Sequence, residues 1–467
     1  MDAISTAQAL ALTTLIRAVR GRASAWAEET GQAVVLAAAL MTALCGVGAI
    51  TVDIGLLVHE RVAIQNAVEA GALAGAQQLP GDAANAEVVA RDYVLDNEPD
   101  LPVGNVNVSF RCVVGDRNFD GLPDLSDIPL ACNPGANATW TTRGGISASP
   151  CIPAEGDACN VIVVQASTDV AFSFAGVLGI PTGSTGVRTS AACRGVCGGP
   201  PTGPVDLLLV VDRTGSMSSG DITNVRNASR SILRLYNPEL QWVGMGLLGP
   251  SQTGSTCSGA NSPAAVRSAS SAQYATANWV PVGLTGVGAP VNQSYLNADG
   301  TVNSASLIAK AITCFDTSST GTNLSTPVDR ARQYLLANGR PNAKKGIILQ
   351  TDGTPNFSGA GNSADYTCAA AYSAATTAKA AGIEIFTVGF GVTGTDMCPD
   401  SSGFYRSRSV TRLLADMASS SIDNGCNAAE NTDGDHFFCA PRTQDLTTIF
   451  QSAAASLAGG ARLIALP

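Results

Sequence analysis

Five oxygen-bearing side chains stand where mostly apolar runs end or where helices are expected to begin. They are Asp212, Thr214, Ser216, Thr322 and Asp352. Carboxylates and hydroxyls are hard donors that suit Mg²⁺, or Mn²⁺, in an octahedral shell that keeps waters, whereas soft transition metals prefer sulfur. Because hydroxyls compensate the charge of the ion only in part, a coordination position stays available for a carboxylate from a protein ligand.

Short strands and helices must position these side chains. Strands are expected at 205–211, 241–248, 346–349 and 383–388, and helices at 221–236, 324–337, 365–381, 410–419 and 443–457. This alternation predicts an α/β fold, a doubly wound and mainly parallel sheet of Rossmann-like type. In such sheets ligands bind at the carboxyl ends of strands, where Asp212 and Asp352 would lie.

A second set of oxygen donors lies earlier in the chain. It consists of Asp116, Asn118, Asp120, Asp124 and Asp127. Donors at alternate positions, a following Gly121 and a carboxylate at position twelve suit Ca²⁺. The alternative is a polar turn without metal, because position twelve is Asp instead of a bidentate Glu and Pro123 lies in the loop.

The cysteines indicate an oxidising compartment. Of thirteen, Cys45 lies in an apolar run and the other twelve form an even set, which predicts disulfides. Zinc is the weaker alternative, since the chain has no CxxC pair and no Cys/His cluster. Short loops favour pairing neighbours in sequence: Cys112 with Cys132, Cys151 with Cys159, Cys193 with Cys197, Cys257 with Cys314, Cys368 with Cys398, and Cys426 with Cys439.

Residues 33–52 carry no charge and are about as long as a membrane-spanning helix needs to be. Arg17, Arg20 and Arg22 precede this run, and Arg61 is the only Arg or Lys in the next twenty-five residues. The asymmetry predicts a single-pass protein with a cytoplasmic N-terminus and the bulk of the chain in the periplasm or at the cell surface.

Three other interpretations of this apolar run are a cleaved signal peptide, a lipoprotein signal and a buried core helix. A cut after Ala49 is conceivable, but helix-compatible sequence continues to Leu79, which favours a retained anchor. Leu44 stands where lipoprotein processing requires a small residue before Cys45. A core helix that is apolar on every side would be unusual beside such polar flanks.

The helix is expected to continue to Leu79, where Pro80 and Gly81 stop it. From residue 33 it would extend about 70 Å. Small residues at 67, 71 and 75 offer a face for close packing against another helix, or for lying on the protein's own domain. After it, a short helix at 84–95 and strands at 106–114, 137–142, 161–167 and 170–177 predict a small β-rich domain, pilin-like in outline by analogy.

Residues 31–80 resemble the N-terminal region of TadG-like Flp pilus-assembly proteins. The matching positions are Asp53, Gly55, Gln65, Glu69 and the run 72–76, and the family usually has Asp where this chain has Glu69. Residues 161–193, with their Val-Leu-Gly-Ile block, resemble the distal strands of the same family. Leu36 stands where prepilin processing requires Glu, which argues against cleavage as a pilin subunit. The resemblance implies an envelope component.

Residues 203–460 resemble a von Willebrand factor A-type domain. The carrying pattern is Asp-x-Ser-x-Ser, then Thr, then Asp, with Thr214 in place of the first Ser. The resemblance implies that the five oxygen-bearing residues form a metal-ion-dependent adhesion site. Together with the Pro- and Gly-rich linker near residue 200, it implies a cytoplasmic segment 1–32, a transmembrane helix 33–52, a TadG-like region 53–200 and the A-type domain 203–460.

Charge and missing motifs narrow the function classes. The net charge is −10 and there are only four lysines, so nucleic acid is a poor partner. There is no HExxH, no phosphate-binding GxxxxGK[ST] and no nucleophile elbow, which argues against an enzyme. Two hypotheses remain: an envelope protein of a Tad-type pilus that contacts pilus or secretion components, and a free-standing adhesin that binds external ligands.

Overall fold

The computed structural model describes residues 4–466 apart from 116–131, 133–138, 144–145, 196, 198–202, 264, 271–272, 275, 357–365, 422–425, 427–429, 441–445 and 460. Side chains are described from residue 34 onward, except those of residues 45, 178 and 432. The chain divides into two compact units, one of Met1–Asn66 with Ala166–Arg188 and one of Ala67–Gln165 with Thr189–Pro467.

The first unit combines a long helix with a hairpin. The helix α1 (Ile4–Ala76) begins well before residue 33, where the charge-free run starts, and ends three residues before the expected Leu79. Of the described helices, α1 is the one long and apolar enough to cross a membrane. Beside it, β5 (Asp169–Ala171) and β6 (Thr182–Ser184) pair antiparallel around the 3₁₀ turn η4 (Ala175–Leu178). Of the expected strand at 170–177 only residues 170–171 are strand, and residues 175–177 belong to η4, which ends at Gly179 in the left-handed conformation.

The second unit contains a small sheet in the order β17-β7-β4-β1-β3-β2. Its strands are β1 (Val106–Gly115), β2 (Thr141–Arg143), β3 (Ile146–Cys151), β4 (Val161–Ala166), β7 (Arg188–Cys193) and β17 (Arg462–Ile464). The expected strands at 106–114 and 161–167 are confirmed, and the expected helix is α2 (Ala83–Asn97). The C-terminal β17 pairs with β7, so the last residues of the chain complete this sheet.

The small-residue face of α1 is used within the protein's own domain. A Cβ added to Gly71 would lie 2.6 Å from the carbonyl oxygen of Ala90, and one added to Gly75 would lie 2.7 Å from that of Ala86. Both contacts are with α2. Residues 67–76 of α1 belong to the second unit together with α2, and the glycines allow this end of α1 to approach α2 backbone to backbone.

The rest of the second unit is a doubly wound α/β domain whose sheet has the order β13-β12-β9-β8-β14-β15-β16. The strands are β8 (Val205–Asp212), β9 (Gln241–Leu248), β12 (Val282–Gly286), β13 (Val291–Asn292), β14 (Lys344–Thr351), β15 (Ile383–Phe390) and β16 (Phe437–Ala440). All neighbours pair parallel except β12 with β9. The expected mainly parallel α/β fold is confirmed. The antiparallel β12, short and with glycines at both Gly283 and Gly286, carries no clear strand pattern in sequence.

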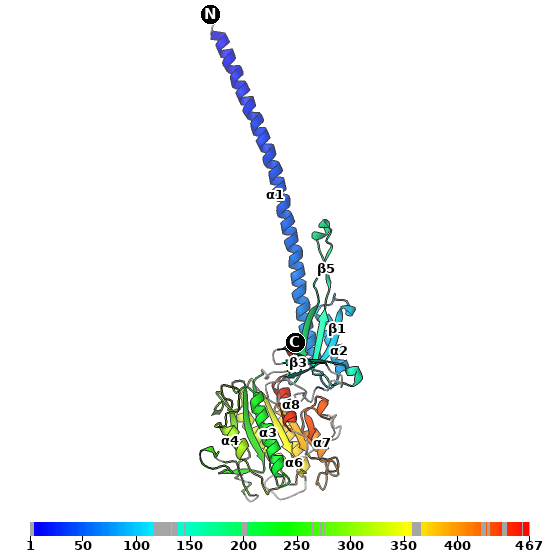
Figure 1. Cartoon of the computed structure of the whole chain (residues 1–467), viewed down its shortest axis with the longest axis vertical. Coiled ribbons are helices and arrows are strands. Elements are labelled where there is room, and N and C mark those ends of the chain that lie inside the picture. Colours follow the sequence, from blue (N-terminus) through cyan, green and yellow to red (C-terminus); the bar gives the residue numbers. More distant parts are fainter. Residues whose placement is uncertain are drawn as a thin grey trace. The chain divides into compact units, whose positions relative to one another are not determined.

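Helices cover both faces of this sheet, as Figure 1 shows. They are α3 (Ser219–Leu235), α4 (Leu307–Cys314), α5 (Ser325–Asn338), α6 (Thr367–Ala380), α7 (Val410–Met417) and α8 (Leu446–Ala458). Because side chains alternate along a strand, Leu207 and Leu209 of β8 pack with α3, α4 and α8, whereas Leu208 and Val210 pack with α5, α6 and α7. Burial of β8 on both faces explains its nearly continuous apolar sequence.

All six expected disulfides form. The bonds join Cys112 to Cys132, Cys151 to Cys159, Cys193 to Cys197, Cys257 to Cys314, Cys368 to Cys398, and Cys426 to Cys439. Their Cα–Cα distances lie between 5.1 and 6.1 Å, within the range that a disulfide spans. The pairing of sequence neighbours is confirmed.

Candidate functional site

The carboxylate of Asp212 lies at the centre of a hydrogen-bonded cluster at the carboxyl end of β8. Its Oδ1 accepts hydrogen bonds from the backbone N–H and the hydroxyl of Thr214, each at 2.7 Å. Its Oδ2 accepts from the hydroxyl of Thr351 at 2.7 Å and from the backbone N–H of Asp352 at 3.3 Å. The register of β8 with β14 places Thr351 and Asp352 beside the end of β8. Two neighbouring strand ends therefore hold this carboxylate in place.

The remaining predicted oxygens lie around it. The hydroxyl of Ser216 donates to Oδ1 of Asp352 at 2.6 Å. The hydroxyl of Thr214 lies 3.1 Å from that of Thr322 and 3.5 Å from that of Ser216. The structure thus brings Asp212, Thr214, Ser216, Thr322 and Asp352 together from three separate loops.

The loop that carries Thr322 is held by amide side chains. The side-chain oxygen of Asn356 accepts a hydrogen bond from the backbone N–H of Thr322 at 2.9 Å. The backbone N–H of Asn356 donates to the Thr322 carbonyl at 3.1 Å. Asn323 accepts the N–H of Thr326 at 3.0 Å, which caps the first turn of α5. The start of α5 is therefore anchored to the segment that follows Asp352.

The electrostatics of the cluster fit a divalent cation. Burial raises the pKa of Asp212 to about 6, the nearby carboxylate of Asp352 adds to the rise, and hydrogen bonds from Thr214 and Thr351 oppose it. Within the described part of the chain, no ion pair includes Asp212. A cation would offset the repulsion between the two carboxylates, and the all-oxygen donor set is of the kind that Mg²⁺ or Mn²⁺ accepts.

Arg213, inside the same loop, is a residue that the sequence analysis missed. The side chain is fully buried and each of its five N–H groups has an acceptor, namely the carbonyls of Gly249, Pro250 and Val266, the hydroxyl of Ser251 and the carboxylate of Asp316. Burial lowers the pKa of Arg213 to about 10, and the Asp316 carboxylate opposes the shift, so the guanidinium stays charged at neutral pH. Its hydrogen bonds connect the loop of Asp212 and Thr214 to the segment 249–251 after β9, to Val266 and to Asp316.

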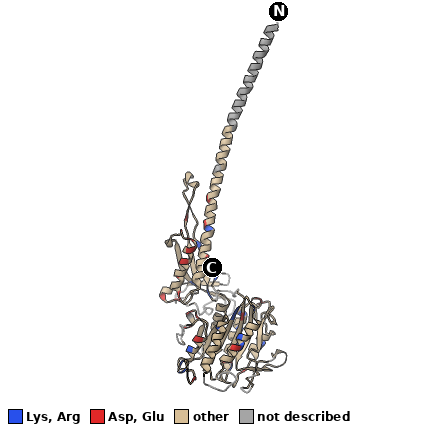
Figure 2. Ribbon diagram, turned by 180° about the vertical axis from the view of Figure 1, so that it is seen from behind, with Lys and Arg blue, Asp and Glu red and all other residues tan. Residues whose placement is uncertain are grey.

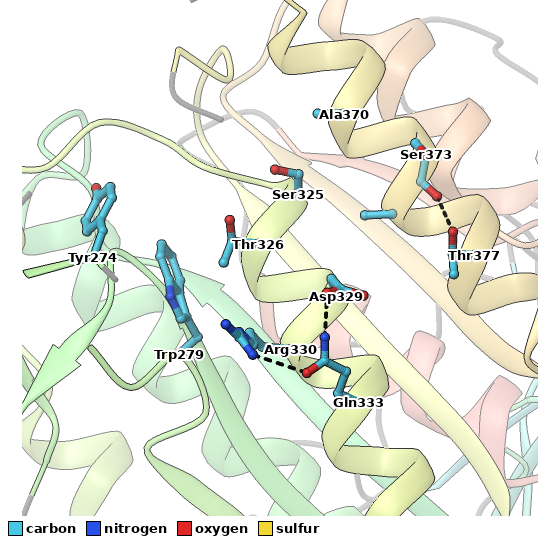
Figure 3. Close-up of a pocket in the computed structure, with 11 residues that line it drawn as sticks. Tyr274, Trp279, Ser325, Thr326, Asp329, Arg330, Gln333, Ala370, Ser373 and Thr377 are labelled. Atoms are coloured by element: carbon cyan, nitrogen blue, oxygen red, sulfur yellow. Dashed lines mark hydrogen bonds between the residues drawn. The ribbon is translucent and has the colours of Figure 1, made fainter. Parts of the chain in front are cut away.

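A pocket of about 670 Å³ lies beside the start of α5. Figure 3 shows Tyr274 and Trp279 on one side and the helix residues Ser325, Thr326 and Arg330 facing them. The rings of Tyr274 and Trp279 are 5.3 Å apart, and the Tyr274 hydroxyl donates to the carbonyl of Gly321 at 3.5 Å. Since Gly321 directly precedes Thr322, the aromatic wall is connected to the oxygen cluster. The pocket has no signature in sequence because its walls come from separate segments.

A second group of acids orders a turn. The carboxylates of Glu430, Asp433 and Asp435 have oxygens within 4.8 Å of one another. Asp433 accepts the N–H of Asp435 at 3.1 Å, and Asp435 accepts that of Phe437 at 2.7 Å. These bonds shape the turn that leads into β16.

The other expected site falls outside the described residues. This is the calcium candidate of Asp116, Asn118, Asp120, Asp124 and Asp127. His436 lies directly before β16, with its ring 4.2 Å from that of Phe386 and its Nε2 3.8 Å from a carboxylate oxygen of Glu384. His436 is thus at the amino end of a parallel strand. The oxygen cluster lies at the other edge of the sheet, where the strands have their carboxyl ends.

Two family models match the chain. Residues 273–450 match the von Willebrand factor type A domain, and residues 31–78 match a model described as putative Flp pilus-assembly TadE/G-like. The chain therefore carries an A domain and an N-terminal TadE/G-like segment, as the two resemblances predicted. Thr322 and Asp352 lie inside the first match, whereas Asp212 lies before it on the central strand of the same sheet.

Several solved structures are similar at low identity. The pilus adhesin SpaC from Lactobacillus rhamnosus GG is 17% identical over 63% of this chain and 32% of its own, with a TM-score of 0.35. Proximal thread matrix protein 1 from the mussel byssus, with a zinc-occupied adhesion-site motif, is 14% identical over 56% and 49%, with a TM-score of 0.33. Manganese-loaded TRAP protein from Plasmodium vivax is 15% identical over 65% and 82%, with a TM-score of 0.30. The chain spans about a third to a half of the first structures matched, and no curated protein matches it.

Proposed function

We propose that this chain is a membrane-anchored envelope protein of a Tad-type pilus or tight-adherence system, whose A domain binds a protein partner through a divalent cation. The observation that carries the proposal is the cluster of two carboxylates and three hydroxyls at the carboxyl edge of the sheet. Asp212, Thr214, Ser216, Thr322 and Asp352 would hold Mg²⁺ or Mn²⁺.

The buried and the exposed donors have different roles in this proposal. Asp212 is buried and fixed by four hydrogen bonds, so it supplies a rigid acceptor at the base of the site. Ser216 is exposed, so its side of the cluster is open to solvent and to a partner. The bound ion supplies a position for a ligand carboxylate, and the three hydroxyls leave enough positive charge on the ion to attract one.

The N-terminal segment supports the envelope location. The large apolar side chains of its charge-free run are exposed along α1, and Figure 2 shows the described part of this run without charged residues. Six disulfides require an oxidising compartment, which fits a chain that lies outside the cytoplasm after residue 52. We propose a cytoplasmic N-terminus, a single span at 33–52, a TadG-like region to residue 200 and the A domain from 203 to 460.

A free-standing surface adhesin is the second candidate, since the metal site alone could bind an external protein. Deletion of the gene separates the two. Loss of piliation supports a role in pilus assembly, whereas normal piliation with lost attachment supports the adhesin. We propose a binding role and not a catalytic one, because the clustered groups are metal ligands by chemistry and carry no paired nucleophile and base.

Metal binding is tested by thermal unfolding of the full-length protein in detergent during a Mg²⁺ titration. The parent should gain stability with increasing Mg²⁺, by about 2.7 kcal/mol at a hundredfold excess over the dissociation constant. Asp352→Asn should gain none. Asp96→Asn, an exposed change on α2, is the matched control and should respond like the parent. Equal stabilisation of Asp352→Asn and the parent would overturn the proposed site.

A further inference from the structure

The hairpin of the first unit carries an exposed apolar tip. Residues 170–187 contain no charge. At the tip, Phe174 is 48%, Val177 88% and Ile180 54% exposed. Large apolar side chains gathered at the end of a protruding hairpin mark a surface that contacts something other than water.

Asp53 of α1 holds this tip. Its carboxylate is only 2% exposed and accepts backbone N–H groups from Ser173 at 2.9 Å, Phe174 at 3.0 Å and Ala175 at 2.6 Å. Asp53 is also the first charged residue after the apolar run 33–52. The apolar tip is therefore fastened to the helix at the end of the proposed membrane span.

A second bond aligns the hairpin with the helix. Arg61 donates from Nη2 to the carbonyl of Ser184 at 3.3 Å, near the base of the hairpin. Asp53 and Arg61 are eight residues apart, about 12 Å along a helix. The hairpin thus follows α1 toward its N-terminal end, as Figure 1 shows for β5, and the tip reaches the level of the span.

Most backbone N–H groups of the tip are hydrogen-bonded within the protein. Asp53 takes three N–H groups, and the N–H groups of Phe172, Val177, Gly179 and Ile180 donate to carbonyls of the hairpin itself. Peptide groups at membrane depth must be paired in this way, because lipid tails offer no hydrogen bonds.

We infer that the tip of this hairpin inserts into the outer surface of the bilayer that α1 crosses, with Phe174, Val177 and Ile180 among the lipids. The inference rests on the proposed membrane anchor. It gives the protein two membrane contacts, a span and a shallow hairpin, joined by the carboxylate of Asp53. Two contacts restrict rocking of the helix and hold the first extracytoplasmic turns at a defined height.

The test uses the full-length protein in nanodiscs made with brominated or ordinary phospholipids. Tryptophan is introduced in three single variants: Val177→Trp at the tip, Val47→Trp in the span, and Val287→Trp at an exposed site of the A domain. The emission added by each variant over the parent is measured with both lipids and with acrylamide in the water. Brominated lipid should quench Val47→Trp and Val177→Trp and leave Val287→Trp unchanged.

The outcomes separate the hairpin from the anchor. Quenching of Val47→Trp together with acrylamide access to Val177→Trp would place the tip in water and overturn the inference while the anchor stands. Protection of Val177→Trp from both quenchers would indicate a protein contact, such as a second copy, and would also overturn it. Absence of lipid quenching at Val47→Trp would refute the anchor itself. Adding Asp53→Ala to Val177→Trp should release the tip and abolish its lipid quenching.

Discussion

The hydroxyl of Ser216 donates a 2.6 Å hydrogen bond to the carboxylate of Asp352, a residue 136 positions later in the chain. Ser216 follows β8 and Asp352 follows β14, and these strands are parallel neighbours in the sheet. Parallel pairing puts both carboxyl ends at one edge, so the contact follows directly from the fold. Together with the bonds from Thr351 and Asp352 to Asp212, it joins the two halves of the proposed metal site.

Stability of the metal-free protein should depend on pH through Asp212. Its pKa is raised from 3.8 to about 6 in the folded state, so the native protein binds more protons than the unfolded chain between these values. The free energy of unfolding should therefore fall as pH rises from about 4 to about 6. Saturating Mg²⁺ favours the ionised carboxylate and should remove or reverse this fall.

Thermal unfolding in EDTA and in Mg²⁺ across that pH window measures the effect. Asp212→Asn cannot ionise, so its metal-free stability should lose this component of the pH dependence, and Mg²⁺ should not stabilise it. Parallel pH profiles for the parent and Asp212→Asn in EDTA would contradict the assignment.

Arg213→Lys should destabilise the A domain although the charge is kept. A lysine has three donors and cannot reach the five acceptors that the buried guanidinium satisfies. We expect a loss of about 1–3 kcal/mol, the cost of leaving a buried acceptor without its donor. Mg²⁺ affinity should fall as well, because Arg213 lies between Asp212 and Thr214.

Denaturant unfolding and Mg²⁺ titration of this variant measure both effects. Arg330→Lys is the control, since Arg330 is exposed on α5 and should tolerate the change within about 0.5 kcal/mol. If Arg213→Lys loses stability but retains the parent's Mg²⁺ affinity, Arg213 supports the fold without positioning the loop that carries Asp212 and Thr214.

Two alanine substitutions in α1 should have opposite effects. Alanine normally favours a helix over glycine by about 1 kcal/mol, and Gly48→Ala meets nothing within 4 Å, so it should be neutral or stabilising. Gly71→Ala would put its Cβ 2.6 Å from the carbonyl oxygen of Ala90, and overpacking of this kind costs about 1–3 kcal/mol.

The measurement is the unfolding midpoint of both variants and the parent in detergent. The midpoint should drop for Gly71→Ala alone. A rise for Gly71→Ala would show that α1 and α2 are not in backbone contact in solution.

Local patterns in the sequence determined much of this protein. The spacing of Asp212, Thr214 and Ser216 after an apolar run identified the metal candidates, and the order of strands and helices predicted a mainly parallel sheet. Neighbouring cysteines predicted the six disulfides, because short loops close at the smallest entropic cost. The charge-free run predicted the long apolar helix α1.

Tertiary structure alone decided the rest. Four features have no pattern in the sequence. They are the acceptors of Arg213, the antiparallel β12, the wall formed by Tyr274 and Trp279, and the hydrogen bonds that Asp53 accepts from the hairpin tip. Most of these features join segments that lie far apart in the chain, as Asp53 and Ala175 do at a separation of 122 residues. The type of a side chain determines its preference for water, a helix or a strand. A hydrogen bond between distant segments depends on where the whole chain brings them, and only the folded structure contains that information.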